Sequence, residues 1–117
     1  MTNLIERLCE AIFRQEGMGP TALNPGNLRG AVWLPRTVAT IRNGFWVPRS
    51  RAEGVAGAAH VVALHIAEGN TLKQLISIWA PPSDHNNTEA YIANVKNWAA
   101  IPDENQPLYN FIEAPLT

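Results

Sequence analysis

The sequence predicts one α+β domain over residues 1–117, mainly helical, with a small β-hairpin region after the first helix. Three observations predict it: apolar side chains at helical spacing near the N-terminus, a segment rich in proline and glycine that contains β-prone runs, and later segments with helix start and stop signals. The hydrophobic content of 46% is enough for a core, and 117 residues are the usual size of one domain.

The first helix is predicted over residues 3–16. One apolar row repeats every four residues along it: Leu4, Leu8 and Ile12. Glu16 is the next position on that row, where burial would raise the pKa of its carboxyl group. Gly17 is a natural end for this helix, because glycine readily adopts the left-handed conformation of a C-cap.

A β-hairpin is predicted next. The runs 37–41 and 45–47 are β-prone, and Arg42-Asn43-Gly44 lies between them. An Asn-Gly pair between two such runs is typical of a tight hairpin turn. A further short strand is predicted within residues 28–34.

A long helix follows the hairpin. Ser50 and Glu53 have the spacing of a capping box and begin a helix that runs to about Glu68. Gly54 and Gly57 lie inside it, and each costs roughly 1 kcal/mol of helix propensity against alanine. Close packing against a neighbouring segment would explain why they are tolerated.

Two shorter helices and a turn complete the predicted fold. Capping-box spacing recurs before a helix over 72–79, which a proline pair ends. After a polar loop, Asn87 or Thr88 caps a helix over 89–99. One short turn is predicted near 108–112.

The composition excludes several classes of protein. The net charge is −1, so we expect no nucleic-acid partner. The single cysteine, Cys9, excludes an internal disulfide and a cysteine-based zinc site. No apolar run approaches the ~20 residues of a membrane helix, and the N-terminal segment lacks the pattern of a signal peptide. We therefore expect no membrane span and synthesis in the cytoplasm.

The charge is unevenly distributed along the chain. Residues 1–51 carry a net charge of +4 and residues 52–117 a net charge of −5. The basic half either faces a polyanion, such as a wall polymer or a nucleic acid, or is an ordinary solvated surface. The chain also has eleven asparagines, which suit a surface that hydrogen-bonds an uncharged ligand.

Glu16 is the leading candidate for a catalytic residue. A glycosidase needs one carboxylic acid that stays protonated near neutral pH, and apolar surroundings raise the pKa enough for that. The alternative is an ordinary solvated glutamate at a helix end. In the Asn-Pro-Gly-Asn-Leu-Arg motif that follows, Asn24 and Asn27 either close a turn or bind a sugar. Arg29 is a potential partner of Glu16, but that pairing would lower the pKa of the acid.

A second polar segment starts at the end of the 72–79 helix. It combines aromatic rings, amides and a carboxylate, as many carbohydrate-binding surfaces do; its candidates are Trp79, Asp84, Asn86, Asn87 and Tyr91. The alternative is a core tryptophan followed by a capped loop. Asp84 is also a candidate for a second catalytic carboxylate. No metal-binding spacing occurs, and nothing in the sequence implies a cofactor.

Several motifs together resemble a known family. These are A-I-x-x-Q-E-G, then N-P-G-N-L-R, then G-F and A-E-G, then T-L-x-x-L-I-x-x-W-A-P-P-S-D-x-N-N-T-x-x-Y-I. The match spans residues 11–98 and resembles a family of small, lysozyme-like phage and prophage proteins. Some members are described as lytic transglycosylases and others as structural proteins of the phage particle.

The resemblance implies a lysozyme-like fold whose first long helix ends in the catalytic acid, Glu16. It places Asn24, Asn27 and Arg29 on the β side of a cleft. On the opposite wall it implies a second group of residues: Trp79, Asp84, Asn86, Asn87 and Tyr91. The implied substrate is the peptidoglycan glycan strand, cut by a monomeric enzyme without metal or cofactor. The expected place of action is a phage particle, or the cell wall after release by another factor.

One departure from phage-type lysozymes bears on the product. Those enzymes carry an aspartate soon after the catalytic glutamate, but here no acid lies between Glu16 and Glu53. A hydrolase normally uses two carboxylates. The absence of this aspartate therefore favours a lytic transglycosylase over a muramidase that adds water. Asp84 or Glu53 reaching the cleft would weaken that argument. The alternative function is a non-catalytic phage structural or glycan-binding protein with the same fold.

Overall fold

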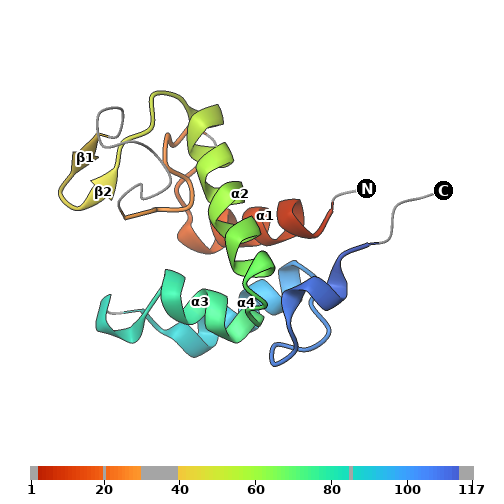
Figure 1. Cartoon of the computed structure of the whole chain (residues 1–117). Coiled ribbons are helices and arrows are strands. Elements are labelled where there is room, and N and C mark those ends of the chain that lie inside the picture. Colours follow the sequence, from red (N-terminus) through yellow and green to blue (C-terminus); the bar gives the residue numbers. More distant parts are fainter. Residues whose placement is uncertain (1–2, 20, 30–39, 85, 114–117) are drawn as a thin grey trace.

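The computed structural model describes residues 3–19, 21–29, 40–84 and 86–113, and Figure 1 shows how they are arranged. Within these residues, four α-helices and one two-stranded antiparallel sheet form a mainly helical fold with a small β region. The element order agrees with the predicted α+β class. The hairpin and the segment after α1 lie beside the start of α2, and α3 and α4 lie at its other end.

Helix α1 (Leu4–Glu16) forms as predicted. The Asn3 side chain caps it by accepting a hydrogen bond from the Glu6 amide at 2.9 Å. The predicted apolar row is fully buried: Leu4, Leu8 and Ile12. Gly17 ends the helix with φ of +65°, and its amide donates to the Phe13 carbonyl. Glu16 is thereby held at the C-terminal end of a helix that lies in the core.

The hairpin consists of β1 (Ile41–Arg42) and β2 (Phe45–Trp46), paired antiparallel. Asn43 and Gly44 form its two-residue turn with φ of +53° and +82°, a conformation that an Asn-Gly pair favours. Thr40 and Val47 are not in the strands, although both were predicted to be, and Arg42 belongs to β1 and not to the turn. Of the strand predicted within 28–34, residues 28 and 29 are not in a strand. The rest of it and residues 37–39 lie outside the described residues.

Helix α2 (Arg51–Ala67) begins at Ser50, whose side chain accepts a hydrogen bond from the Glu53 amide. The reciprocal half of the predicted capping box is absent. The Glu53 carboxylate instead accepts hydrogen bonds from the backbone and side chain of Arg49. An arginine one position before the cap competes for this carboxylate with a charge-assisted bond.

The two internal glycines of α2 are buried, and Gly54 has a clear structural reason. A Cβ atom added there would overlap the carbonyl group of Leu23 and touch the ring of Pro25. The backbone of the segment after α1 therefore lies directly on α2 at this position. The close packing that the sequence predicts is confirmed at Gly54.

Helices α3 (Leu72–Trp79) and α4 (Thr88–Trp98) also begin at predicted caps. Thr71 and Gln74 form a complete capping box, and Asn87 accepts a hydrogen bond from the Ala90 amide. A short 3₁₀ turn, Pro82–Asp84, connects the two helices, and another, Leu108–Phe111, lies near the predicted C-terminal turn.

One core joins all four helices, because α1 packs against α2 and α4, and α3 packs against α4. Cys9 belongs to this core, and burial raises the pKa of its thiol to about 12. It is therefore a packing residue and not a nucleophile. No helix in the described ranges is long and apolar enough to cross a bilayer.

Candidate functional site

A cleft of about 480 Å³ lies between the end of α1, the 27–29 segment, α2 and the end of α3. Six of the nine residues proposed from sequence line it: Glu16, Asn27, Arg29, Trp79, Asp84 and Asn86. They come from segments up to 70 positions apart in the chain. The fold thus brings most of the two predicted polar segments to one place.

Glu16, the last residue of α1, is half-buried and lines this cleft. Burial raises the pKa of its carboxyl, and the nearby polar side chains of Asn27 and Tyr91 partly offset that rise. The helix dipole is negative at the C-terminus of α1, which also disfavours the charged carboxylate. Arg29 pairs with Asp84, and among the described residues no ion pair neutralises Glu16.

Tyr91 lies behind Glu16 and does not line the cleft. Its side chain is 3% exposed, and its hydroxyl makes no direct hydrogen bond to a described residue. The hydroxyl is nevertheless close enough to Glu16 for the two groups to affect each other's protonation. Burial, followed by the Glu16 charge, raises the pKa of Tyr91. The resemblance implied a wall position for this residue, whereas the structure buries it near Glu16.

Asn24 also lies outside the cleft, because its side chain closes the Asn-Pro-Gly-Asn turn. Its Nδ2 donates to the carbonyls of Leu28 and Trp46 at 3.0 Å each, and its Oδ1 accepts from the Leu28 amide. Of the two roles considered for this residue, the structure displays the turn-closing one. Asn27 differs: its φ is +53°, and its exposed side chain is in the cleft beside Glu16.

Asn24→Asp is expected to lower the free energy of unfolding by about 2 kcal/mol or more. The aspartate keeps the acceptor for Leu28 but loses both donated bonds and faces two carbonyl oxygens with a charge. Urea denaturation at neutral pH measures the change. Asn43→Asp, in the exposed hairpin turn, is the matched control and should change stability by less than about 0.5 kcal/mol. Equal effects of the two changes would contradict this role of Asn24.

Trp79 joins the turn to α3. Its Nε1–H donates to the Gly26 carbonyl at 2.9 Å, and a Cβ atom at Gly26 would come within 2.9 Å of the indole ring. The ring therefore lies against the turn backbone and also lines the cleft. Both the core role and the cleft role considered for this residue are present in the structure.

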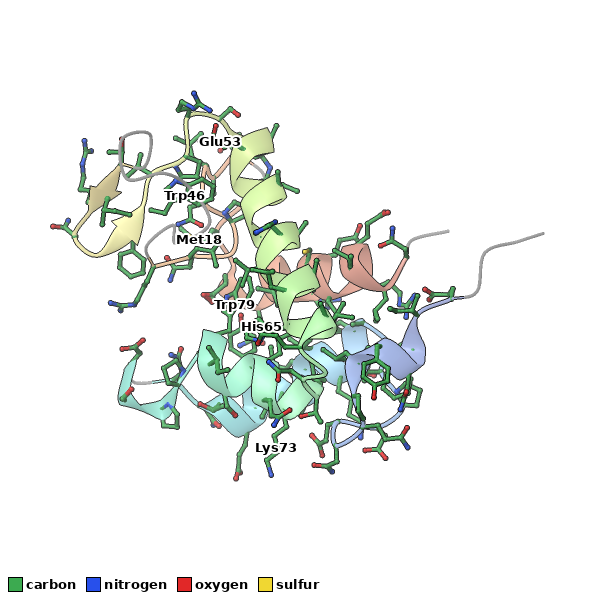
Figure 2. All side chains as sticks on the ribbon, in the orientation of Figure 1. Met18, Trp46, Glu53, His65, Lys73 and Trp79 are labelled. Carbon is green, nitrogen blue, oxygen red and sulfur yellow. The ribbon has the colours of Figure 1, made fainter. Side chains whose placement is uncertain are left out.

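His65 lines the cleft and was missed by the sequence analysis. Figure 2 labels it near Trp79, where α2 passes α3. Its Nδ1 lies 2.7 Å from Asn70 Nδ2, and burial lowers its pKa, which favours the neutral form of the ring. It lies one helical turn after Val61, which lines the same cleft, but the sequence alone does not show that this face of the helix is open.

The remaining polar residues divide between the cleft and helix capping. Asn86 lines the cleft and donates to the Pro81 carbonyl at 3.2 Å, whereas Asn87 caps α4. Asp84 is the second carboxylate that reaches the cleft, and Glu53 does not reach it. No group of three potential metal ligands occurs among the described residues.

No family model, no curated protein and no solved structure matches the chain. The geometry therefore carries the functional argument. It combines one half-buried carboxyl of raised pKa with amides, an imidazole, an indole and a guanidinium around an open cleft. Such a site can protonate a bound neutral oxygen and hold a polar, largely uncharged ligand by hydrogen bonds.

Proposed function

We propose that this chain is a lysozyme-like enzyme that cleaves the β-1,4 bond between N-acetylmuramic acid and N-acetylglucosamine in peptidoglycan. Glu16 is its general acid. The observation that carries the proposal is the placement of Glu16, which is half-buried, of raised pKa and open to a polar cleft. A helix-terminal glutamate of the ordinary kind would be solvated, with a normal pKa.

The first step is proton transfer from the Glu16 carboxyl to the glycosidic oxygen. The bond between that oxygen and the muramic C1 breaks, and the glucosamine side leaves as an alcohol. The raised pKa favours the protonated form of Glu16 before the step. The resulting carboxylate is left beside the Asn27 side chain and the Tyr91 hydroxyl, which favour its charged form.

The second step follows a one-carboxylate route in our proposal. The muramic C6 hydroxyl attacks C1 of the same sugar, and Glu16 takes its proton, which restores the acid and yields a 1,6-anhydro product. Asp84 reaches the cleft, so water addition assisted by a second carboxylate is the competing route. In the free protein Asp84 is paired with Arg29 across 3.6 Å. We favour the one-carboxylate route because no acid lies between Glu16 and Glu53, where phage-type lysozymes carry their second carboxylate.

The proposal is tested by mass spectrometry of purified peptidoglycan after incubation with the protein. Anhydro-muropeptides are the expected product. Products with a reducing end would support an enzyme whose second step is hydrolysis. Loss of those products in Asp84→Asn would then identify Asp84 as the second carboxylate. Intact glycan with a folded protein would overturn the enzymatic proposal and favour the non-catalytic phage protein.

Tyr91→Phe is expected to shift the alkaline limb of kcat/KM to higher pH. The Tyr91 hydroxyl lowers the pKa of Glu16, so its removal leaves the effect of burial less opposed and keeps the acid protonated at higher pH. The free energy of unfolding should change little, because that hydroxyl has no direct hydrogen-bond partner among the described residues. A limb that stays in place or moves to lower pH would contradict this role.

A further inference from the structure

We propose that the Arg29 guanidinium is a receptor for a carboxylate carried by the glycan substrate, and that Asp84 occupies this receptor in the free protein. The inference rests on the proposed function and deepens it. It predicts that the cleft distinguishes acidic wall glycans from neutral polymers of N-acetylglucosamine.

Arg29 is held in place from the hairpin side of the cleft. Its guanidinium carbon lies 4.5 Å from the centre of the Phe45 ring. A planar guanidinium on an aromatic face is a stable arrangement that leaves its edge and its N–H groups available. The Phe45 ring thus holds the Arg29 guanidinium in position without engaging its N–H donors.

The partner across the cleft engages Arg29 only loosely. Arg29 Nε lies 3.6 Å from Asp84 Oδ2, which is longer than the 2.7–2.9 Å of a good charge-assisted hydrogen bond. The two side chains are 57% and 37% exposed. Exposed pairs of this kind contribute little stability, so another carboxylate can replace Asp84 at small cost.

The observed pair points to a carboxylate as the ligand, because Asp84 already presents one to Arg29. A guanidinium presents parallel N–H groups that match the two oxygens of a carboxylate. Peptidoglycan supplies that group from two sources: the lactyl carboxyl of muramic acid on strands without peptide, and the carboxyls of the stem peptide. A polymer of N-acetylglucosamine has neither. Asp84 supplies the same group from within the chain and therefore competes with both.

The test is calorimetric titration of the Glu16→Gln protein, in which turnover is not expected to interfere. The probes are a tetrasaccharide of alternating glucosamine and muramic acid with free lactyl carboxyls, the same compound with those carboxyls amidated, a peptide-bearing tetrasaccharide, and chitotetraose. We expect an acidic probe to bind about fivefold more tightly than its neutral counterpart at low salt. The tighter of the two acidic probes identifies the source of the carboxylate.

Two variants in the same background should move this preference in opposite directions. Arg29→Gln should abolish the preference for carboxylate, whereas Asp84→Asn should increase the affinity for acidic probes because it removes the internal competitor. Arg42→Gln is the matched control, since Arg42 is exposed on β1 and does not line the cleft. It should retain the preference.

The outcomes separate this inference from the proposed function. Cleavage of peptidoglycan with equal affinity for acidic and neutral probes would overturn the receptor and leave the enzyme. A carboxylate preference that depends on Arg29, in a protein without turnover, would support the receptor and overturn catalysis. Binding of no probe would overturn the receptor, and cleavage of peptidoglycan by the wild-type protein would still decide the proposed function. Weaker binding of acidic probes to Asp84→Asn would also overturn the receptor, because Asp84 would then be a ligand contact.

Discussion

Glu16→Gln is expected to lower turnover of peptidoglycan by at least about 100-fold while leaving the fold and glycan binding intact. Glutamine has the same shape, but it has no proton to give to the glycosidic oxygen. Release of soluble muropeptides measures turnover, and calorimetry with a glycan tetrasaccharide measures binding. Glu10→Gln, on an exposed position of the same helix, is the matched control and should keep full activity.

The same substitution should reveal a cost that Glu16 imposes on stability. Because burial raises its folded-state pKa, the wild-type protein loses stability as the pH rises from the unfolded pKa through the folded one. Glu16→Gln lacks this titration, so it should be equally stable at neutral pH or more stable. Below about pH 4, where the wild-type acid is protonated, this difference should vanish. Full activity of the variant would end the proposed mechanism.

Gly54→Ala is expected to destabilise the protein by about 3 kcal/mol, although helix propensity alone predicts stabilisation by roughly 1 kcal/mol. The added methyl group would overlap the Leu23 carbonyl, so either α2 or the segment after α1 must move. Chemical denaturation measures the change. Movement of that segment would also displace Asn27 and Arg29, so glycan binding should weaken in any fraction that remains folded.

The control for Gly54→Ala is the reverse change at an exposed position of the same helix. Ala56→Gly should cost only about 1 kcal/mol, from helix propensity. Both substitutions would then destabilise the protein, although they are opposite in direction. Gly54→Ala would lower the free energy of unfolding more than Ala56→Gly. A stabilising Gly54→Ala would show that the backbone contact at Leu23 relaxes freely.

The helices and their caps could be predicted because their causes are local. Asn87 and Thr71 cap helices through hydrogen bonds within three residues, and Gly17 ends α1 by its own conformation. The Asn-Gly turn is equally local. The Glu53 carboxylate does not accept the expected hydrogen bond from the Ser50 amide. It accepts hydrogen bonds from Arg49, which lies just outside the motif and is a stronger, charged donor.

The candidate site was only partly predictable, since exposure and partners are set by tertiary packing. Asn24 and Asn27 have the same side chain three positions apart, yet one closes the turn and the other is in the cleft. Tyr91 was predicted to line the cleft, but it is buried and does not line it. Nor could the sequence alone decide that Arg29 pairs with Asp84 and not with Glu16.

The hydrogen bond between the Trp79 indole and the Gly26 carbonyl attaches the turn to the end of α3. Asn24 ties the same turn to the backbone of Trp46, so one four-residue turn links the hairpin to α3. These bonds set the spacing of the two sides within the fold. For the glycan that we propose as ligand, a preformed cleft would mean that binding needs no closing motion to bring its two sides together.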